Sequence, residues 1–166
     1  MAETDEPDNA RLRAMLDEWE CVKLQQEYWL AETRQDPDRL AGVFTTDATL
    51  GSVRGREEIR GWAASRMGPG SFLASLLHRY SSPPVIADFA VTGDTARGTV
   101  YGLSIHHFRS PEGVERVRIV SAGYDNRYQR TADGWRISSM HGIENPDGIQ
   151  DMHWRFEGDM ATGPLF

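Results

Sequence analysis

The sequence predicts an α+β fold in which helices come first and an antiparallel sheet follows. Two observations support this. Apolar residues recur at helical spacing up to about residue 34, and from residue 78 onwards the chain reads as extended runs joined by short turns. Short connections between extended runs are typical of antiparallel neighbours. A strongly bent sheet wrapped around the first helices would form a cone with room for a cavity.

The first half of the chain reads as an arm and three helices. Residues 1–8 are predicted as a flexible arm, and a long helix is predicted over 9–34, apolar on two faces and therefore packed on two sides. Asp36-Pro37 starts a short second helix, with Asp as N-cap. A strand over 45–53 and a third helix from Gly55 to the Gly68-Pro69-Gly70 break follow. The broad helical stripe comprises Leu12, Met15, Leu16, Trp19, Val22, Trp29 and Leu30, and the opposite one comprises Cys21, Leu24 and Tyr28.

Four extended runs form the predicted sheet, over residues 78–90, 94–108, 115–130 and 135–143, with Pro83-Pro84 at an edge or bulge. Alternation assigns their faces. With Arg79 outward, His78 and Tyr80 point inward. His106 also faces inward and His107 outward, unless a bulge intervenes.

The last hairpin places Asn126 on the inward face, between Tyr124 and Tyr128. Buried amides and hydroxyls must find partners, so this pattern predicts a polar pocket inside the sheet. The alternatives are a polar core network and a dimer face. Two histidines and an amide are the groups that proton abstraction beside a carbonyl needs, without a metal or an organic cofactor.

Composition limits the classes of function. A length of 166 residues favours one domain, and a net charge of −7 argues against a nucleic-acid partner. The single cysteine, Cys21, leaves no disulfide framework, and no acid joins the histidines at a spacing typical of a metal site. The acidic start lacks the apolar core of a signal peptide, and no apolar run is long enough to span a membrane. A cytoplasmic protein is therefore expected.

Over about residues 10–145 the chain resembles the SnoaL-like members of the nuclear-transport-factor-2-like (NTF2-like) superfamily, cone-shaped α+β barrels with a cystatin-like fold. Residues 28–44, Asp47-Ala48, 55–59, His78, 93–96 and 124–137 carry the resemblance, by their order and spacing together. Within the superfamily the chain is most similar to the scytalone dehydratase, bile-acid dehydratase and polyketide cyclase branch.

The resemblance implies a set of site residues. His78 falls at the pocket histidine of that branch, His106 at a second histidine, Asn126 at a pocket asparagine and Tyr28 at a pocket tyrosine. The aspartate that orients the first histidine falls at Thr33, which can hold a water but cannot stabilise an imidazolium by charge. This departure leaves room for a cyclase or isomerase. The adjacent acid, Glu32, is expected on a different side of the helix.

These observations predict a cofactor-free acid–base enzyme, a dehydratase or a cyclase or isomerase. Its substrate would be a hydrophobic oxygenated small molecule, such as a polyketide, terpenoid or steroid-like intermediate. Residues 9–145 would form the domain, residues 146–166 a lid, and two copies a homodimer. The predicted catalytic residues are His78, His106, Thr33, Tyr28 and Asn126, and the predicted substrate-binding residues are Tyr124, His141, Trp29, Trp62, Tyr80 and Met67, with no metal ligand.

Two other functions fit the same fold. A non-catalytic ligand carrier or assembly subunit is favoured by the missing acid at position 33. An epoxide hydrolase or epoxide-opening cyclase would need a buried carboxylate–arginine set, which the sequence alone does not assemble.

Overall fold

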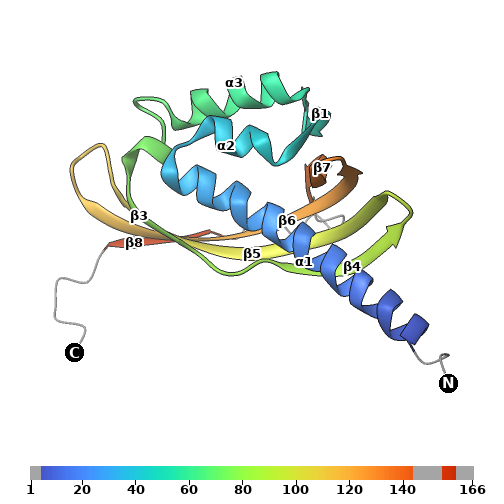
Figure 1. Ribbon diagram of the computed structural model, residues 1–166. Coiled ribbons are helices and arrows are strands. Elements are labelled where there is room, and N and C mark those ends of the chain that lie inside the picture. The colour runs from blue at the N-terminus through green and yellow to red at the C-terminus, as the bar shows by residue number, and fades with distance from the viewer. Residues whose placement is uncertain (1–4, 144–154, 160–166) are drawn as a thin grey trace, which may run out of the picture.

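The computed structural model describes the backbone of residues 5–143 and 155–159, and the side chains of residues 8–143. Helix α1 (Asp5–Arg34) lies across the concave face of a curved sheet. Helices α2 (Pro37–Gly42) and α3 (Arg56–Met67) form a second helical layer on the far side of α1 (Figure 1). The predicted α+β cone is confirmed.

The sheet has eight strands and does not close on itself. Its path runs β2-β1-β7-β6-β5-β3, with β4 also paired to β5 and β8 also paired to β6. The β1–β7 pair is parallel, so the sheet is mixed and not purely antiparallel as predicted. The strands are β1 (Phe44–Leu50), β2 (Val53–Arg54), β3 (Leu76–Ser81), β4 (Val85–Thr92), β5 (Thr95–Arg109), β6 (Glu115–Thr131), β7 (Gly134–Gly142) and β8 (Arg155–Asp159).

Local sequence signals account for several element boundaries. The Asp36 side chain accepts a hydrogen bond from the Arg39 backbone N–H at 2.9 Å, with Pro37 as the first residue of α2, as predicted. The run predicted over 78–90 is two strands, because Pro83 and Pro84 have no N–H to donate to a ladder. A one-turn 3₁₀ helix (Leu73–Ser75) precedes β3. Helix α1 begins at Asp5, inside the stretch predicted as a flexible arm.

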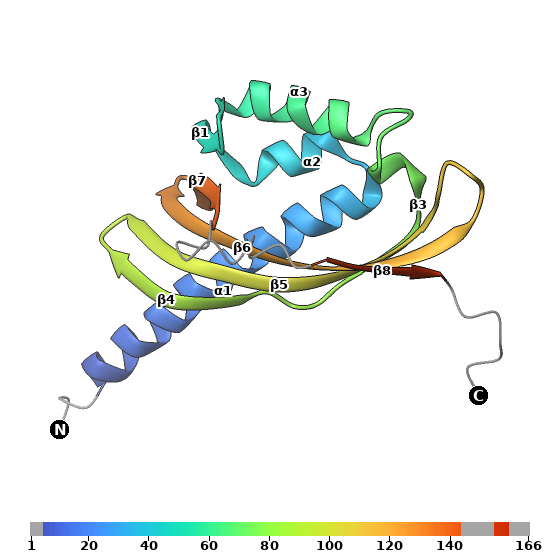
Figure 2. The same cartoon turned by 180° about the vertical axis from the view of Figure 1, so that it is seen from behind.

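The buried face of α1 differs from the predicted one. Leu12, Met15, Leu16 and Trp19 were expected to be packed, but their exposed fractions are 55 to 58%. The N-terminal half of α1 extends past the edge of the sheet (Figure 2), so nothing in the described chain covers that stripe. Periodicity shows that a helix has an apolar face but not how far the neighbouring layer reaches.

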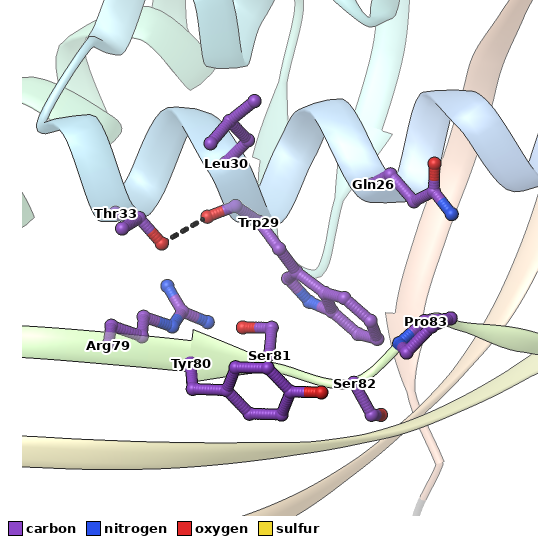
Figure 3. Close-up of a pocket in the computed structure, with 9 residues that line it drawn as sticks. All are labelled: Gln26, Trp29, Leu30, Thr33, Arg79, Tyr80, Ser81, Ser82 and Pro83. Atoms are coloured by element: carbon purple, nitrogen blue, oxygen red, sulfur yellow. Dashed lines mark hydrogen bonds between the residues drawn. The ribbon is translucent and has the colours of Figure 1, made fainter.

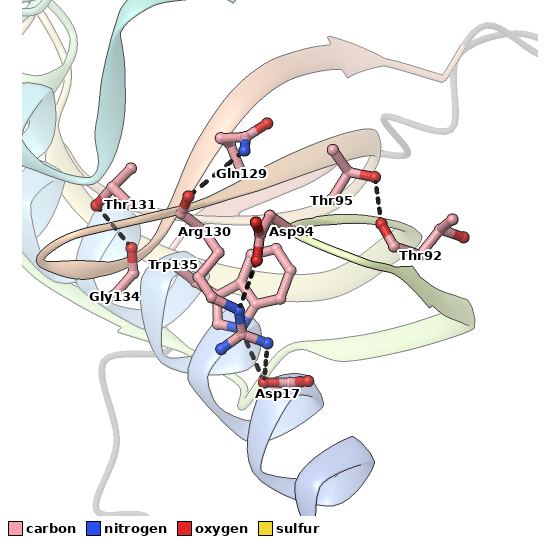
Figure 4. A network of polar contacts seen from close by, with 9 residues as sticks. All are labelled: Asp17, Thr92, Asp94, Thr95, Gln129, Arg130, Thr131, Gly134 and Trp135. Atoms are coloured by element: carbon pink, nitrogen blue, oxygen red, sulfur yellow. Dashed lines mark hydrogen bonds and ion pairs between the residues drawn. The ribbon is translucent and has the colours of Figure 1, made fainter.

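A polar cluster fixes α1 against the end of the sheet. Asp17 accepts one hydrogen bond from the Arg130 guanidinium at 2.8 Å and another from the Trp135 indole N–H at 3.0 Å (Figure 4). Arg130 also lies over the Trp135 ring, 4.4 Å from its centroid. The helix is therefore held on β6 and β7 by one carboxylate, which sets the position of the residues further along α1.

The outer face of the sheet carries exposed apolar side chains. Tyr101, Leu103 and Ile105 alternate along β5 and are 40 to 48% exposed. The homodimer stays a prediction, which analytical ultracentrifugation would test. This exposed apolar face is a candidate surface for a second copy. In the part of the chain that the structure describes, no helix combines the length and apolarity needed to span a bilayer.

Candidate active site

The structure reverses the predicted faces of β3. The ladder between β3 and β5 pairs Arg79 with His106 and His78 with His107. Arg79 points inward with 6% of its side chain exposed, whereas His78 is exposed and stacks on His107 on the outer face. The inward orientation expected for His78 and Tyr80 is therefore wrong. An irregularity between Leu76 and His78 shifts the alternation, which a period-two pattern cannot reveal.

His106 faces the interior, as predicted. The β5–β6 register runs unbroken from residue 95 to residue 109, so no bulge at Gly102 exchanges His106 with His107. Gly102 has another role, because the Trp29 ring of α1 packs directly on its backbone. A Cβ at residue 102 would lie 2.9 Å from Cζ3 of Trp29 and would overlap the ring tip. Glycine here lets the indole form a wall of the interior.

A cavity of about 230 Å³ lies between α1, α3, β3, β5 and β6. The indole of Trp29 and the side chains of Phe72 and Val120 give it apolar walls. Its polar and charged lining residues are Glu32, Arg66, Arg79, Ser104, His106, Arg118 and Tyr124. Titratable groups that converge on a concave apolar space are the usual mark of a small-molecule site.

A buried ion pair forms one side of this cavity. Arg79 donates to a Glu32 carboxylate oxygen at 2.7 Å, and the two side chains are 6% and 12% exposed. Arg79 is also 3.4 Å from the Ser104 hydroxyl, and its Nε has no hydrogen-bond partner among the described residues. Glu32 lies on a different side of the helix from Thr33, as expected, and this is the side that faces the cavity. It follows Gln25 and Tyr28 at helical spacing, and these two residues are buried, so it shares their inward face.

His106 has no hydrogen-bond partner on either ring nitrogen among the described residues, although the residue is only 8% exposed. Burial, with the nearby Arg79 and Arg118 guanidiniums, lowers the pKa of His106 to about 4. The imidazole is therefore neutral at neutral pH, with one N–H donor and one bare nitrogen. A buried polar group left unsatisfied in a cavity is a candidate for contact with a ligand.

Tyr124 completes the polar lining. Burial and the neighbouring Glu32 carboxylate raise the pKa of Tyr124 to about 12. The Tyr124 hydroxyl accepts a hydrogen bond from the Trp29 indole N–H. The phenol therefore keeps its proton at neutral pH and can donate it in a hydrogen bond. The predicted binding role of Tyr124 and of Trp29 stays a prediction, and both residues line this cavity.

Asn126 and Tyr28 are buried but do not line the cavity. Asn126 is fully buried and donates to Gln25 Oε1 at 3.0 Å and to the Tyr128 hydroxyl at 3.1 Å. Tyr28 packs edge-to-face on Phe44, with ring centroids 6.0 Å apart. Asn126 therefore belongs to a polar core network, which was one of the alternatives that the sequence allowed.

Thr33 lies outside the cavity, in a surface groove of about 440 Å³ between α1 and the end of β3 (Figure 3). Its hydroxyl donates to the Trp29 carbonyl at 2.9 Å, and the exposed Tyr80 lines the same groove. Trp29 and Arg79 border both the groove and the cavity. The predicted pairing of Thr33 with an inward His78 does not occur.

Three further residues that were predicted to bind substrate lie outside the lining of this cavity. His141 is exposed, Met67 is buried in the core, and Trp62 is half-buried beneath Arg66, whose guanidinium lies 5.0 Å from the ring centroid. Residues 146–154 and 160–166 of the predicted lid lie outside the described residues, and residues 155–159 form β8, which pairs with β6. The described residues include no group of three His, Cys, Asp or Glu that could hold a metal ion.

The sequence reasoning missed Arg79 and Arg118. Arg118 lies on β6, which is paired on both sides, and lines the cavity. Its guanidinium lies 4.3 Å from the Phe72 centroid and 4.8 Å from that of Phe108. A usable signal existed, because Arg118 has the same parity as Tyr124 and Asn126 on an unbroken strand.

Comparisons with known proteins agree with this architecture. A curved sheet around a long helix, closed by two shorter helices over a polar cavity, defines a protein of the NTF2-like superfamily. The sequence profile of the SnoaL-like domain matches residues 13–141, and the chain belongs to the SnoaL-like family.

Sequence relatives and solved structures give the same result. The uncharacterized protein Rv2910c of Mycobacterium tuberculosis is 31% identical over 127 residues, covering 73% of this chain and 80% of the relative. An NTF2-like protein with a cystatin-like fold from Novosphingobium aromaticivorans is 20% identical, with a TM-score of 0.60 and coverage of 86% and 90%.

Structural neighbours that bear enzyme names include two that cover nearly all of this chain. A type 2 hexachlorocyclohexane dehydrochlorinase (LinA) is 19% identical, with a TM-score of 0.55 and coverage of 98% of this chain and 99% of the neighbour. A protein of Novosphingobium aromaticivorans provisionally named a scytalone dehydratase is 13% identical, with a TM-score of 0.56 and coverage of 96% and 94%. At these identities the likeness establishes the fold and not the reaction.

Proposed function

We propose that the protein is a cofactor-free acid–base enzyme that eliminates water from, or isomerises, an oxygenated small molecule, with His106 as the group that carries the proton. One observation carries the proposal. A buried neutral imidazole, with no partner on either nitrogen among the residues that the structure describes, faces a cavity that also holds a carboxylate–arginine pair and a phenol. The SnoaL-like family and the dehydratase and dehydrochlorinase names of structural neighbours support elimination chemistry.

His106 supplies both halves of the proton transfer. Its bare nitrogen takes the proton from the carbon next to a substrate carbonyl, which leaves an enolate. The enolate electrons re-form the carbonyl with a new C=C bond and expel the β-hydroxyl, which takes the proton back from the imidazolium and leaves as water. Because the pKa of His106 is lowered, return of the proton from the imidazolium is favourable, whereas abstraction from carbon by so weak a base requires strong stabilisation of the enolate.

The neighbouring groups lower the cost of the enolate. The cationic Arg79, held in place by Glu32, and the protonated Tyr124 can both donate hydrogen bonds to the developing oxygen anion. Donors fixed beforehand in a buried site are more effective than mobile ones in water, because they need no reorientation during the reaction. In this mechanism Glu32 is a positioning residue and takes no proton.

The test uses a bicyclic β-hydroxyketone, 3-hydroxy-1-tetralone, which gives fluorescent 1-naphthol when it loses water. We expect enzyme-dependent release of 1-naphthol, reduced by about 10²–10⁴-fold in the variant His106→Asn. His78→Asn is the matched control, since its ring lies on the outer face of β3, and should keep full activity.

Near-normal turnover by folded His106→Asn would remove His106 from the mechanism. If the wild-type protein binds the ketone but releases it chemically unchanged, the carrier function replaces the enzymatic one.

A further inference from the structure

The N-terminal half of α1 carries an apolar stripe that no other part of the described chain covers. Its four side chains are 55 to 58% exposed: Leu12, Met15, Leu16 and Trp19. Their spacing places them on one face of the helix. That face points away from the fully buried Cys21 and Gln25, on a part of α1 that extends beyond the sheet (Figure 2). An exposed apolar row on a projecting helix is a typical docking surface.

Charged residues flank the stripe in a regular pattern. One flank carries Arg11 and Glu18, and the other carries Arg13 and Glu20. On each flank the glutamate follows the arginine by about two helical turns, so both side chains lie on the same side of the helix. Glu20 is half-buried and the other three are exposed. None of the four forms an ion pair with another residue of the described chain, so these charges are open to a partner.

The stripe is complementary to an antiparallel copy of itself. A twofold axis between residues 15 and 16 places Leu12 opposite Trp19 of a second copy, and Met15 opposite Leu16 of that copy. Every apolar side chain of the stripe then meets an apolar side chain of the other helix. A single patch can therefore form both sides of the contact, as a twofold interface requires.

The flanking charges select the antiparallel orientation. The same axis places Arg11 beside Glu18 of the second copy on one flank, and Arg13 beside Glu20 of the second copy on the other. Every charged contact across the axis thus joins opposite signs. A parallel pair would instead place arginine beside arginine and glutamate beside glutamate, which is unfavourable.

A further match lies at the two ends of the paired region. Asp8 falls beside Lys23 of the second copy in the same register. The Lys23 amine lies 5.1 Å from the centroid of the Trp19 ring, which keeps this positive charge next to the stripe. The chemistry of the surface therefore fits a second copy of this chain along its whole length.

We propose that two copies of this chain associate through the N-terminal halves of α1, as an antiparallel helix pair centred between Met15 and Leu16. This surface is separate from the outer face of the sheet at Leu103 and from the cavity at His106. Small interfaces are typical of weak, reversible complexes, so the Kd should be on the order of 10 µM.

Sedimentation equilibrium over a series of protein concentrations measures this Kd. Leu16→Asp should raise it at least about tenfold, because a carboxylate at the apolar centre of the pair loses its water. The variant should fold, since Leu16 is 57% exposed. Leu103→Asp is the matched control: this leucine is 48% exposed on the outer face of β5, and its variant should associate through α1 as the wild type does.

A charge exchange tests the register. Arg11→Glu and Glu18→Arg each place like charges beside one another across the axis, so each variant alone should bind itself about tenfold more weakly than the wild type does. An equimolar mixture of the two restores opposite charges at both contacts, and its components should associate with each other at least as tightly as the wild type. Added NaCl should weaken the wild-type pair, because it screens attractive contacts.

A wild-type protein that stays monomeric at every concentration would overturn the proposal. So would an unchanged Kd in Leu16→Asp, and loss of association in Leu103→Asp alone would assign the contact to the sheet instead. A mixture of the two charge variants that associates no better than each variant alone, or a wild-type pair that NaCl strengthens, would contradict the antiparallel register.

Discussion

Two groups of buried polar side chains lie between α1 and β6, and they differ in what surrounds them. In the first group, Asn126 donates to Gln25 and Tyr128, and all three residues are fully or almost fully buried. In the second, Glu32, His106 and Tyr124 line a cavity of about 230 Å³. Both groups include residues of α1 and β6, and the second adds His106 from β5. Buried polarity by itself is therefore no sign of a binding site, and the space beside the polar atoms distinguishes the two.

Breaking the ion pair of the cavity should have the largest effect on stability. Glu32→Ala leaves Arg79 buried without its counter-ion, so we expect the free energy of unfolding in urea to fall by about 3–5 kcal/mol. Glu27→Ala is the matched control on the same helix. Its partner Arg39 is bonded at 2.7 Å, but the pair is exposed, with 43% of Glu27 and 31% of Arg39 accessible. That variant should lose at most about 1 kcal/mol. Equal losses would contradict a special role for the buried pair.

The hydrogen-bonded group of Asn126, Gln25 and Tyr128 should contribute to stability and not to turnover. Asn126→Ala leaves the Gln25 carbonyl oxygen and the Tyr128 hydroxyl without this donor, so the free energy of unfolding should decrease by about 1–3 kcal/mol. Turnover of 3-hydroxy-1-tetralone per folded molecule should stay within a factor of about three, because the bonding is remote from His106. A loss of turnover as large as that of His106→Asn, with the fold intact, would return Asn126 to the site.

The cavity wall depends on a close approach of backbone and indole. Gly102→Ala inserts a methyl group into the Trp29 ring, and overpacking of this kind costs about 1–3 kcal/mol. The displaced indole should also change the tryptophan emission and lower the turnover of 3-hydroxy-1-tetralone. Gly61→Ala in α3, where a Cβ meets nothing within 4 Å, is the control and should instead stabilise the protein slightly, by up to about 1 kcal/mol.

Local rules predicted the fold well because they act over a few residues. The Asp36-Pro37 helix start and the hairpin before Trp135 follow from capping and turn chemistry, and the structure contains both. What failed depends on distant neighbours. The exposed stripe at Leu12 and Trp19 reflects where the sheet ends, and no periodicity within the helix contains that information.

The candidate site was half predictable, for a similar reason. His106 and Tyr124 were placed inward correctly because β5 and β6 keep strict alternation over their shared ladder. His78 was placed wrongly because Arg79 was taken to face solvent, whereas its side chain is buried on the inner face and paired with Glu32. Glu32 was not predicted as a site residue, although its spacing from Gln25 and Tyr28 puts it on the buried side of α1.

The proposed reaction requires His106 to be a buried neutral imidazole that faces the cavity. Because its pKa is lowered in the folded state, the native protein binds fewer protons than the unfolded chain between about pH 6.5 and pH 4. The free energy of unfolding should therefore fall as the pH drops through that window, and His106→Asn should remove this part of the dependence.

The most direct measurement is the titration of the His106 ring by ¹⁵N NMR, with the resonance assigned by its loss in His106→Asn. A midpoint near pH 4 is the result that the structure predicts. A midpoint at or above pH 6.5 would show a solvated or charge-paired ring and would contradict both the buried cavity and the reaction assigned to it.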